Sequence, residues 1–106
     1  MTNNIQFAGT DGNLSVSHET AIQLPAIIVN YLWELALSED YQMYEKQTFL
    51  LEAVELGGRS LQDIYHFGDQ GNAVDKRRVF GFEPVTCDLQ IINDHGRYQM
   101  QLSTGR

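Results

Sequence analysis

Three histidines, each close in sequence to a carboxylate, are the residues best suited to acid–base or metal chemistry. The pairs are His18 with Glu19, His66 with Asp69, and Asp94 with His95. A zinc site needs three or four converging ligands, which commonly recur at short fixed spacings. The three pairs lie far apart and follow no such spacing. We therefore predict no metal site, no cofactor and no catalytic residues, and hence a protein that is not an enzyme.

The single cysteine is a second candidate for chemistry, as a nucleophile. A reactive cysteine must be exposed and its thiolate must be stabilised. Cys87 instead alternates with Leu89 and Ile91 in a strand pattern, which predicts a buried structural residue. One cysteine cannot form an internal disulfide, and the start of the chain lacks the basic and apolar regions of a signal peptide. We therefore expect a cytoplasmic protein.

Binding to phosphates, nucleic acid or membrane is disfavoured. Gly57-Gly58 lacks the Lys-Ser/Thr that completes a phosphate-binding loop, so it indicates a turn. Lys76-Arg77-Arg78 is the only basic cluster, and the formal net charge is −7. Because contact with nucleic-acid phosphates depends on Lys and Arg, we predict no direct nucleic-acid binding. The longest near-apolar run, Leu24 to Val29, is too short to span a bilayer.

Acidic residues are concentrated between Glu34 and Asp69, where only Lys46 and Arg59 are basic. The acids in this segment are Glu34, Glu39, Asp40, Glu45, Glu52, Glu55, Asp63 and Asp69. They form either a solvated surface that favours solubility or a negative patch that faces a basic partner.

The 106 residues are 42% hydrophobic and 20% charged, which is typical of a single globular domain. Pro25 to Leu37 is predicted to be a helix, because proline suits the first helical position. Its apolar arc spans about 240°, far more than the roughly 100° that a surface helix needs. We expect the flank with Val29, Trp33 and Ala36 to be covered in one of two ways. Either a second copy covers it in a two-fold dimer, or the first hairpin or the loop after Ser38 folds over it.

Alternating apolar residues predict hairpins at both ends of the chain. The first runs from Ile5 to Ser17, and the second pairs Thr86–Asn93 with Arg97–Leu102 around an Asn-Asp-His-Gly turn. The polar stretch from Gly68 to Arg78 is predicted to be a loop. Residues 38–56 are ambiguous: they suit a second helix ending at the two glycines, or a strand from Thr48 that returns after those glycines to Phe67.

The order of features along nearly the whole chain resembles domain-of-unknown-function family 960, from Gram-positive bacteria and their phages. The matching features are Leu24-Pro25 opening a helix with Trp33, a strand over Phe49–Leu56, His66 followed by Gln70, and a closing hairpin over Ile91–Leu102. The chain departs from the family pattern at Asp69–Asn72 and at Ser103–Arg106. The resemblance implies a hairpin over Thr48–Phe67 and a phage or mobile-element origin. It carries over no functional residue.

These patterns predict an α+β fold, with one main helix packed on a mostly antiparallel sheet built from hairpins. The function we expect is that of a small acidic binding or regulatory protein, one that blocks a basic host protein through a protein–protein surface. The predicted interaction residues are Val29, Trp33, Ala36, Glu39, Asp40 and Glu45. The alternative is a small enzyme or ligand-binding module with a cleft near His66 and Asp69.

Overall fold

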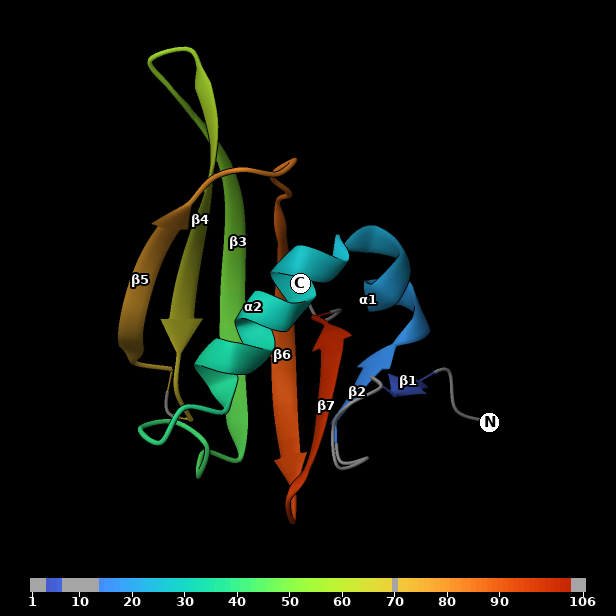
Figure 1. Ribbon diagram of the computed structural model, residues 1–106. Helices are drawn as coiled ribbons and strands as arrows, with labels where there is room; N and C mark the ends of the chain where they lie inside the picture. Colours follow the sequence, from blue (N-terminus) through green and yellow to red (C-terminus); the bar gives the residue numbers. More distant parts are fainter. Residues whose placement is uncertain (1–3, 7–13, 70, 104–106) are drawn as a thin grey trace.

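A seven-stranded mixed β-sheet forms most of the protein, and helix α2 crosses one of its faces (Figure 1). The computed structural model describes residues 4–6, 14–69 and 71–103. The strands are β1 (Asn4–Gln6), β2 (Leu14–Ser17), β3 (Lys46–Leu56), β4 (Arg59–Phe67), β5 (Ala73–Val79), β6 (Cys87–Asp94) and β7 (Arg97–Leu102). The helices are α1 (His18–Gln23) and α2 (Ala26–Ala36). The strand order across the sheet is β1-β2-β7-β6-β3-β4-β5.

The two central hairpins were predicted correctly. Strands β3 and β4 pair in register from Thr48 with Phe67 to Leu56 with Arg59, so only two glycines form the turn. Both glycines have positive φ, 59° and 80°, which a two-residue hairpin turn favours. Strands β6 and β7 also pair antiparallel, as expected. Strands β1 and β2 are antiparallel too, while the predicted turn between them lies outside the described residues.

The predicted fold class is wrong. Strands hold 51% of the residues and helices 19%, divided between two short helices, so the protein is not one main helix packed on a sheet. The sheet is also mixed, because β2 pairs parallel with β7. Helix α2 itself lies where the sequence placed it, between Pro25 and Leu37. Neither helix of the described chain combines the length and apolar character needed to cross a membrane.

Two elements, α1 and β5, were not predicted from the sequence. Helix α1 begins after Ser17, whose side chain accepts a hydrogen bond from the backbone N–H of Thr20 at 3.3 Å and so caps the helix. Strand β5 forms within the segment that was predicted to be a polar loop. It is polar because it is the outermost strand, and charged side chains are common on edge strands.

The core lies between α2 and one face of the sheet. Alternate residues of β3 and β4 point to this face, so Phe49, Leu51 and Ile64 are fully buried there. From α2, Ile28 and Leu32 pack into the same cluster. The intervening residues of β3 and β4 point to the opposite face, where most keep more solvent exposure and Asp63 is buried.

Candidate partner-binding surface

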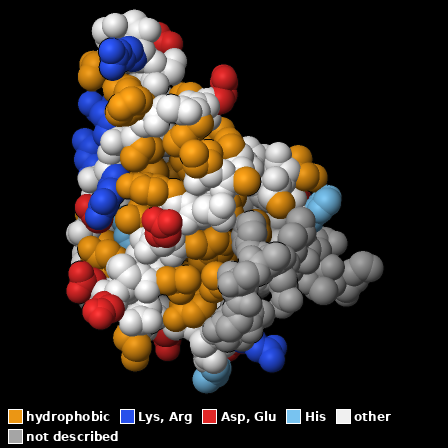
Figure 2. Space-filling view, viewed as in Figure 1, with side chains coloured by type: hydrophobic (Ala, Val, Ile, Leu, Met, Phe, Trp, Pro, Cys, Tyr) orange, Lys and Arg blue, Asp and Glu red, His pale blue; other side chains and the backbone are white. Residues whose placement is uncertain are grey.

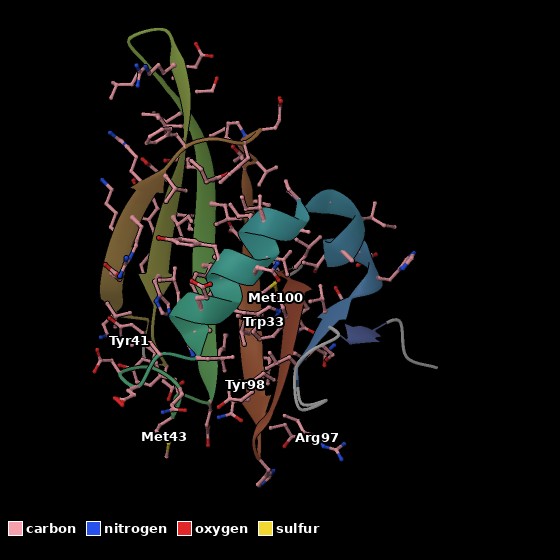
Figure 3. The ribbon with its side chains drawn as sticks, viewed as in Figure 1. Trp33, Tyr41, Met43, Arg97, Tyr98 and Met100 are labelled. Carbon is pink, nitrogen blue, oxygen red and sulfur yellow. The ribbon has the colours of Figure 1, made fainter. Side chains whose placement is uncertain are left out.

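The structure buries the helix flank that the sequence analysis proposed as an interface. Val29, Trp33 and Ala36 are 2%, 5% and 0% exposed and belong to the core. Figure 3 shows Trp33 over the β6–β7 hairpin, on which Tyr98 and Met100 also lie. The expectation that one sheet leaves this flank uncovered is therefore wrong. Of the two alternatives, the structure shows burial within the chain.

The three acidic residues of the predicted interaction set lie together on the surface. Glu39, Asp40 and Glu45 are exposed in the loop between α2 and β3, residues 37–45, which we call the acidic loop. Figure 2 shows Asp and Glu side chains at the lower left, where this loop lies. Met43, in the same loop, exposes 83% of its surface (Figure 3). The acidic loop thus presents one exposed apolar side chain and three exposed carboxylates.

Hydrogen bonds from the β6–β7 hairpin hold the backbone of the acidic loop. The hydroxyl of Tyr98 donates to the carbonyl of Gln42 at 3.0 Å, and Nδ2 of Asn93 donates to the same carbonyl at 3.3 Å. The backbone N–H of Asn93 donates to the carbonyl of Glu45 at 2.8 Å. Within the loop, the N–H groups of Tyr41 and Gln42 both donate to the carbonyl of Ser38 at 3.0 Å. The loop backbone is therefore held in place although its acidic side chains and Met43 are exposed.

The side chain of Gln47, in β3, forms hydrogen bonds that hold the acidic loop. Its side-chain Nε2 donates to the carbonyls of Ala36 and Tyr41, each at 3.0 Å. The first of these carbonyls belongs to the last turn of α2, where backbone acceptors have no partner within the helix. Gln47 is only 1% exposed, so these bonds are shielded from water. One buried amide thus joins the end of α2 to the middle of the acidic loop.

His66 completes this buried anchor. Its Nε2 lies 2.5 Å from Oε1 of Gln47, and an amide oxygen only accepts, so Nε2 carries the proton. The imidazole stacks on Phe49 at 4.3 Å between centroids and meets the ring of Tyr41 edge-on at 4.7 Å. Burial lowers the pKa of His66 to about 4, against an ordinary value of 6.5. The ring is therefore neutral at neutral pH, and its buried Nδ1 has no hydrogen-bond partner.

The structure does not bring His66 and Asp69 together as a site. His66 bonds Gln47 in the core, whereas the exposed Asp69 accepts a hydrogen bond from the backbone N–H of Lys46 at 2.7 Å. The alternative of a cleft formed by these two residues therefore gains no support.

The other candidates for chemistry are also dispersed. Of the remaining histidines, Nδ1 of His95 lies 2.8 Å from the carboxylate of its neighbour Asp94, and His18 lies exposed at the start of α1. Cys87 is partly buried, and burial raises the pKa of its thiol, which favours the unreactive form. In the ranges that the structure describes, no three His, Cys, Asp or Glu residues lie close enough to hold a metal ion.

The basic cluster on β5, Lys76-Arg77-Arg78, contacts two carboxylates and one aromatic ring. Arg78 binds the buried carboxylate of Asp63 through two bonds of 2.7 and 3.0 Å, which lowers the pKa of Asp63. Arg77 binds Asp75 at 2.8 Å. The ammonium of Lys76 lies 5.2 Å from the centre of the Tyr65 ring. These contacts fix the side chains of β5 at the edge of the sheet.

Sequence reasoning found the acidic residues of the loop but missed the residues that fix it. Gln47 gave a usable signal, because it shares the alternation of Phe49 and Leu51 and so occupies a core position that normally takes an apolar residue. Asn93 and Tyr98 gave none, since their side-chain bonds to Gln42 span 51 and 56 positions in the chain.

Comparison of the chain with protein-family models, with curated proteins and with solved structures finds no match. The resemblance to domain-of-unknown-function family 960 therefore stays a prediction.

Proposed function

We propose that this chain is a non-enzymatic binding protein that contacts a basic protein partner through the acidic loop. The observation that carries the proposal is Met43, which is 83% exposed among exposed carboxylates on a loop with a fixed backbone. Exposed carboxylates and single exposed apolar side chains are each common on protein surfaces, so the proposal rests on their presence together on one anchored loop.

The two kinds of side chain contribute differently to such a contact. Glu39, Asp40 and Glu45 attract a positive surface over a distance of about 8 Å at physiological ionic strength, which speeds association. Met43 contributes affinity, because a flexible thioether adapts to the shape of an apolar pocket. Burying it fully contributes on the order of 1.5–3 kcal/mol.

The anchors make binding more favourable by reducing its entropic penalty. A loop that must become ordered on binding loses conformational entropy for every residue that it fixes. Here Gln47, Asn93 and Tyr98 already hold the backbone. The partner therefore meets a preformed surface.

The class of partner follows from charge and from the family resemblance. A negative surface is complementary to a protein that itself binds nucleic acid. Inhibition of such a host protein by a phage or mobile-element product in the cytoplasm is the biological role we propose.

A charge-reversal experiment tests the proposal. Asp40→Lys with Glu45→Lys is compared with Glu55→Lys and Glu83→Lys, two exposed acids outside the loop, so that both variants change the net charge equally. Each protein is used to capture partners from a lysate of the native host, and the captured protein is then titrated at several salt concentrations. We expect the loop variant to lose binding, the control to retain most of it, and the wild-type affinity to fall as salt rises. Equal losses in both variants, or an affinity indifferent to salt, would contradict the proposal.

Met43 has its own test against the same partner. Met43→Ser should weaken binding without altering its dependence on salt, because it removes apolar contact and no charge. Ile27→Ser, at an exposed apolar position on α2, is the matched control. If both substitutions leave affinity unchanged, Met43 is not part of the contact.

A further inference from the structure

Tyr41 of the acidic loop lies against His66 in the core. Its ring meets the imidazole edge-on, with 4.7 Å between the ring centroids, while Phe49 stacks on the imidazole at 4.3 Å. Phe49 is fully buried and belongs to the central strand β3, whereas Tyr41 is partly exposed. Of these two ring contacts, the one with Tyr41 can therefore be broken without disturbing the sheet, because Tyr41 lies in a loop.

The backbone of Tyr41 is joined to His66 as well, through Gln47. The side-chain Nε2 of Gln47 donates to the carbonyl of Tyr41 at 3.0 Å, and its Oε1 accepts from Nε2 of His66. The ring and the backbone of one loop residue thus both depend on the pair formed by His66 and Gln47. A movement of Tyr41 away from this pair breaks both contacts at once.

A second proton on His66 is disfavoured while the loop is closed. The neutral ring uses its Nε2–H for Gln47, so a further proton would go to Nδ1, which is buried without a hydrogen-bond partner. An imidazolium has two N–H donors and a charge, and a buried donor without an acceptor is destabilising. The side chain of His66 is only 1% exposed. The protonated ring is therefore favoured only in a state in which water reaches Nδ1.

The groups around the ring do not offset this effect of burial. From β5, Asp75 lies opposite His66 in the register and favours the imidazolium, while Arg77 opposes it and binds Asp75 at 2.8 Å. From β3 the ring meets Phe49 and a neutral amide, and from the acidic loop it meets the phenol ring of Tyr41. Burial outweighs the attraction to Asp75 and lowers the pKa of His66 to about 4.

We propose that the acidic loop and His66 open as one unit, so that proton uptake by His66 releases the loop from its anchor on β3. In the open state Tyr41 leaves the imidazole, Gln47 loses its bond to the loop, and the strands of the sheet stay paired. Acid favours this state, because the open form binds the proton more tightly than the closed form does. The consequence for binding rests on the proposed function: acid loosens the preformed surface and weakens binding of the partner.

Hydrogen exchange measured by NMR at pH 7 and pH 5 tests the proposal without any partner. The N–H groups of Tyr41 and Gln42, which both donate to the carbonyl of Ser38, report on the loop. Each exchange rate is divided by that of an unstructured peptide at the same pH, which gives an opening constant. A ring that titrates at 6.5 when exposed and at about 4 when buried raises this constant about 20-fold between the two pH values.

Two controls accompany the measurement. His66→Gln keeps a donor for Gln47 and does not titrate, so its loop should have the same opening constant at both pH values. Within the wild type, the N–H of Ser103 donates to the carbonyl of Asp88 at the end of β7, which β6 and β3 separate from β4. Opening there does not expose His66, so its opening constant should not change. This second control decides the question if the variant fails to fold.

Three results would overturn the proposal. The first is a loop opening constant in the wild type that is the same at pH 7 and pH 5. The second is an equal rise in His66→Gln or at Ser103, which would assign the effect to other titrating groups. The third is exchange in the loop that is no faster than in β3 and β6, because the loop would then open only when the whole domain unfolds. None of these results affects the proposed function, and loss of binding in the charge-reversal test would not affect the link between His66 and the loop.

Discussion

His66 should make the protein lose stability in mild acid. Its pKa falls from 6.5 to about 4 on folding, chiefly through burial, while Asp75 acts to raise it and Arg77 to lower it. Between these two values the unfolded chain binds more protons than the native protein, so stability decreases as pH falls. Each unit of pKa corresponds to about 1.4 kcal/mol, which gives a total of about 3 kcal/mol below pH 4 and about 2 kcal/mol at pH 5.

The measurement is urea unfolding at pH 7 and pH 5, with the fluorescence of Trp33 as the probe, since Trp33 is the only tryptophan and is buried. His66→Gln is the reference, because its amide can still donate to Gln47 and does not titrate. We expect the wild type to lose about 2 kcal/mol more than the variant between the two pH values. Asp63 and Asp75 have lowered pKa values, so they lose their stabilising effect only at lower pH.

Two results would refute this reasoning. One is the same pH dependence in the wild type and in His66→Gln. The other is an NMR titration in which the His66 ring takes up its proton near pH 6.5 while the protein stays folded.

Three further substitutions test other contacts. Trp33→Ala should reduce the free energy of unfolding by about 3–5 kcal/mol in urea denaturation, because it removes a buried aromatic; a loss below 1 kcal/mol would place Trp33 outside the core. Arg78→Ala should lower the free energy of unfolding in urea denaturation at pH 7, since it leaves the buried Asp63 without its cation, and the loss should shrink in acid as Asp63 is protonated. Gly68→Ala should cost about 1–3 kcal/mol by thermal unfolding, because its Cβ would lie 2.7 Å from the Tyr44 ring. Adding Tyr44→Ala should remove that penalty. If Gly68→Ala costs the same stability with Tyr44 and with Ala at position 44, the penalty does not come from contact with the Tyr44 ring.

The elements that sequence predicted correctly have local causes. Cys87, Leu89 and Ile91 alternate with polar residues, and a turn sequence separates them from a second alternating run, so neighbouring residues alone specify that hairpin. Helix α2 is similar, because Pro25 marks its start. Strand β5 has no local signal: its Lys-Arg-Arg segment becomes a strand because β4 supplies hydrogen bonds to it. Strand preference depends more on such context than helix preference does.

The candidate surface likewise has some features that the sequence predicts and others that it does not. Charge alone predicts that Glu39, Asp40 and Glu45 are exposed, because isolated carboxylates are seldom buried. The sequence could not show what buries Trp33. A wide apolar arc indicates that a helix is covered on several sides, but it does not identify the covering element. The anchoring of the acidic loop depends on Tyr98 and Asn93, which meet it only after the sheet has formed.

The parallel pairing of β2 with β7 has a consequence for how the protein folds. Ser15 and Tyr98 are joined by a side-chain hydrogen bond although they are 83 positions apart, whereas β3 and β4 meet across a two-glycine turn. A pairing between distant segments requires a long loop to close, and the entropy of that loop is lost before the stabilising contacts form. Topologies rich in such distant pairings therefore fold slowly. The β3–β4 hairpin is therefore expected to gain hydrogen-exchange protection first, and β2 last. Until β7 is in place, the edge of β6 lies open, and a chain in that state is the one most prone to pair with another and aggregate.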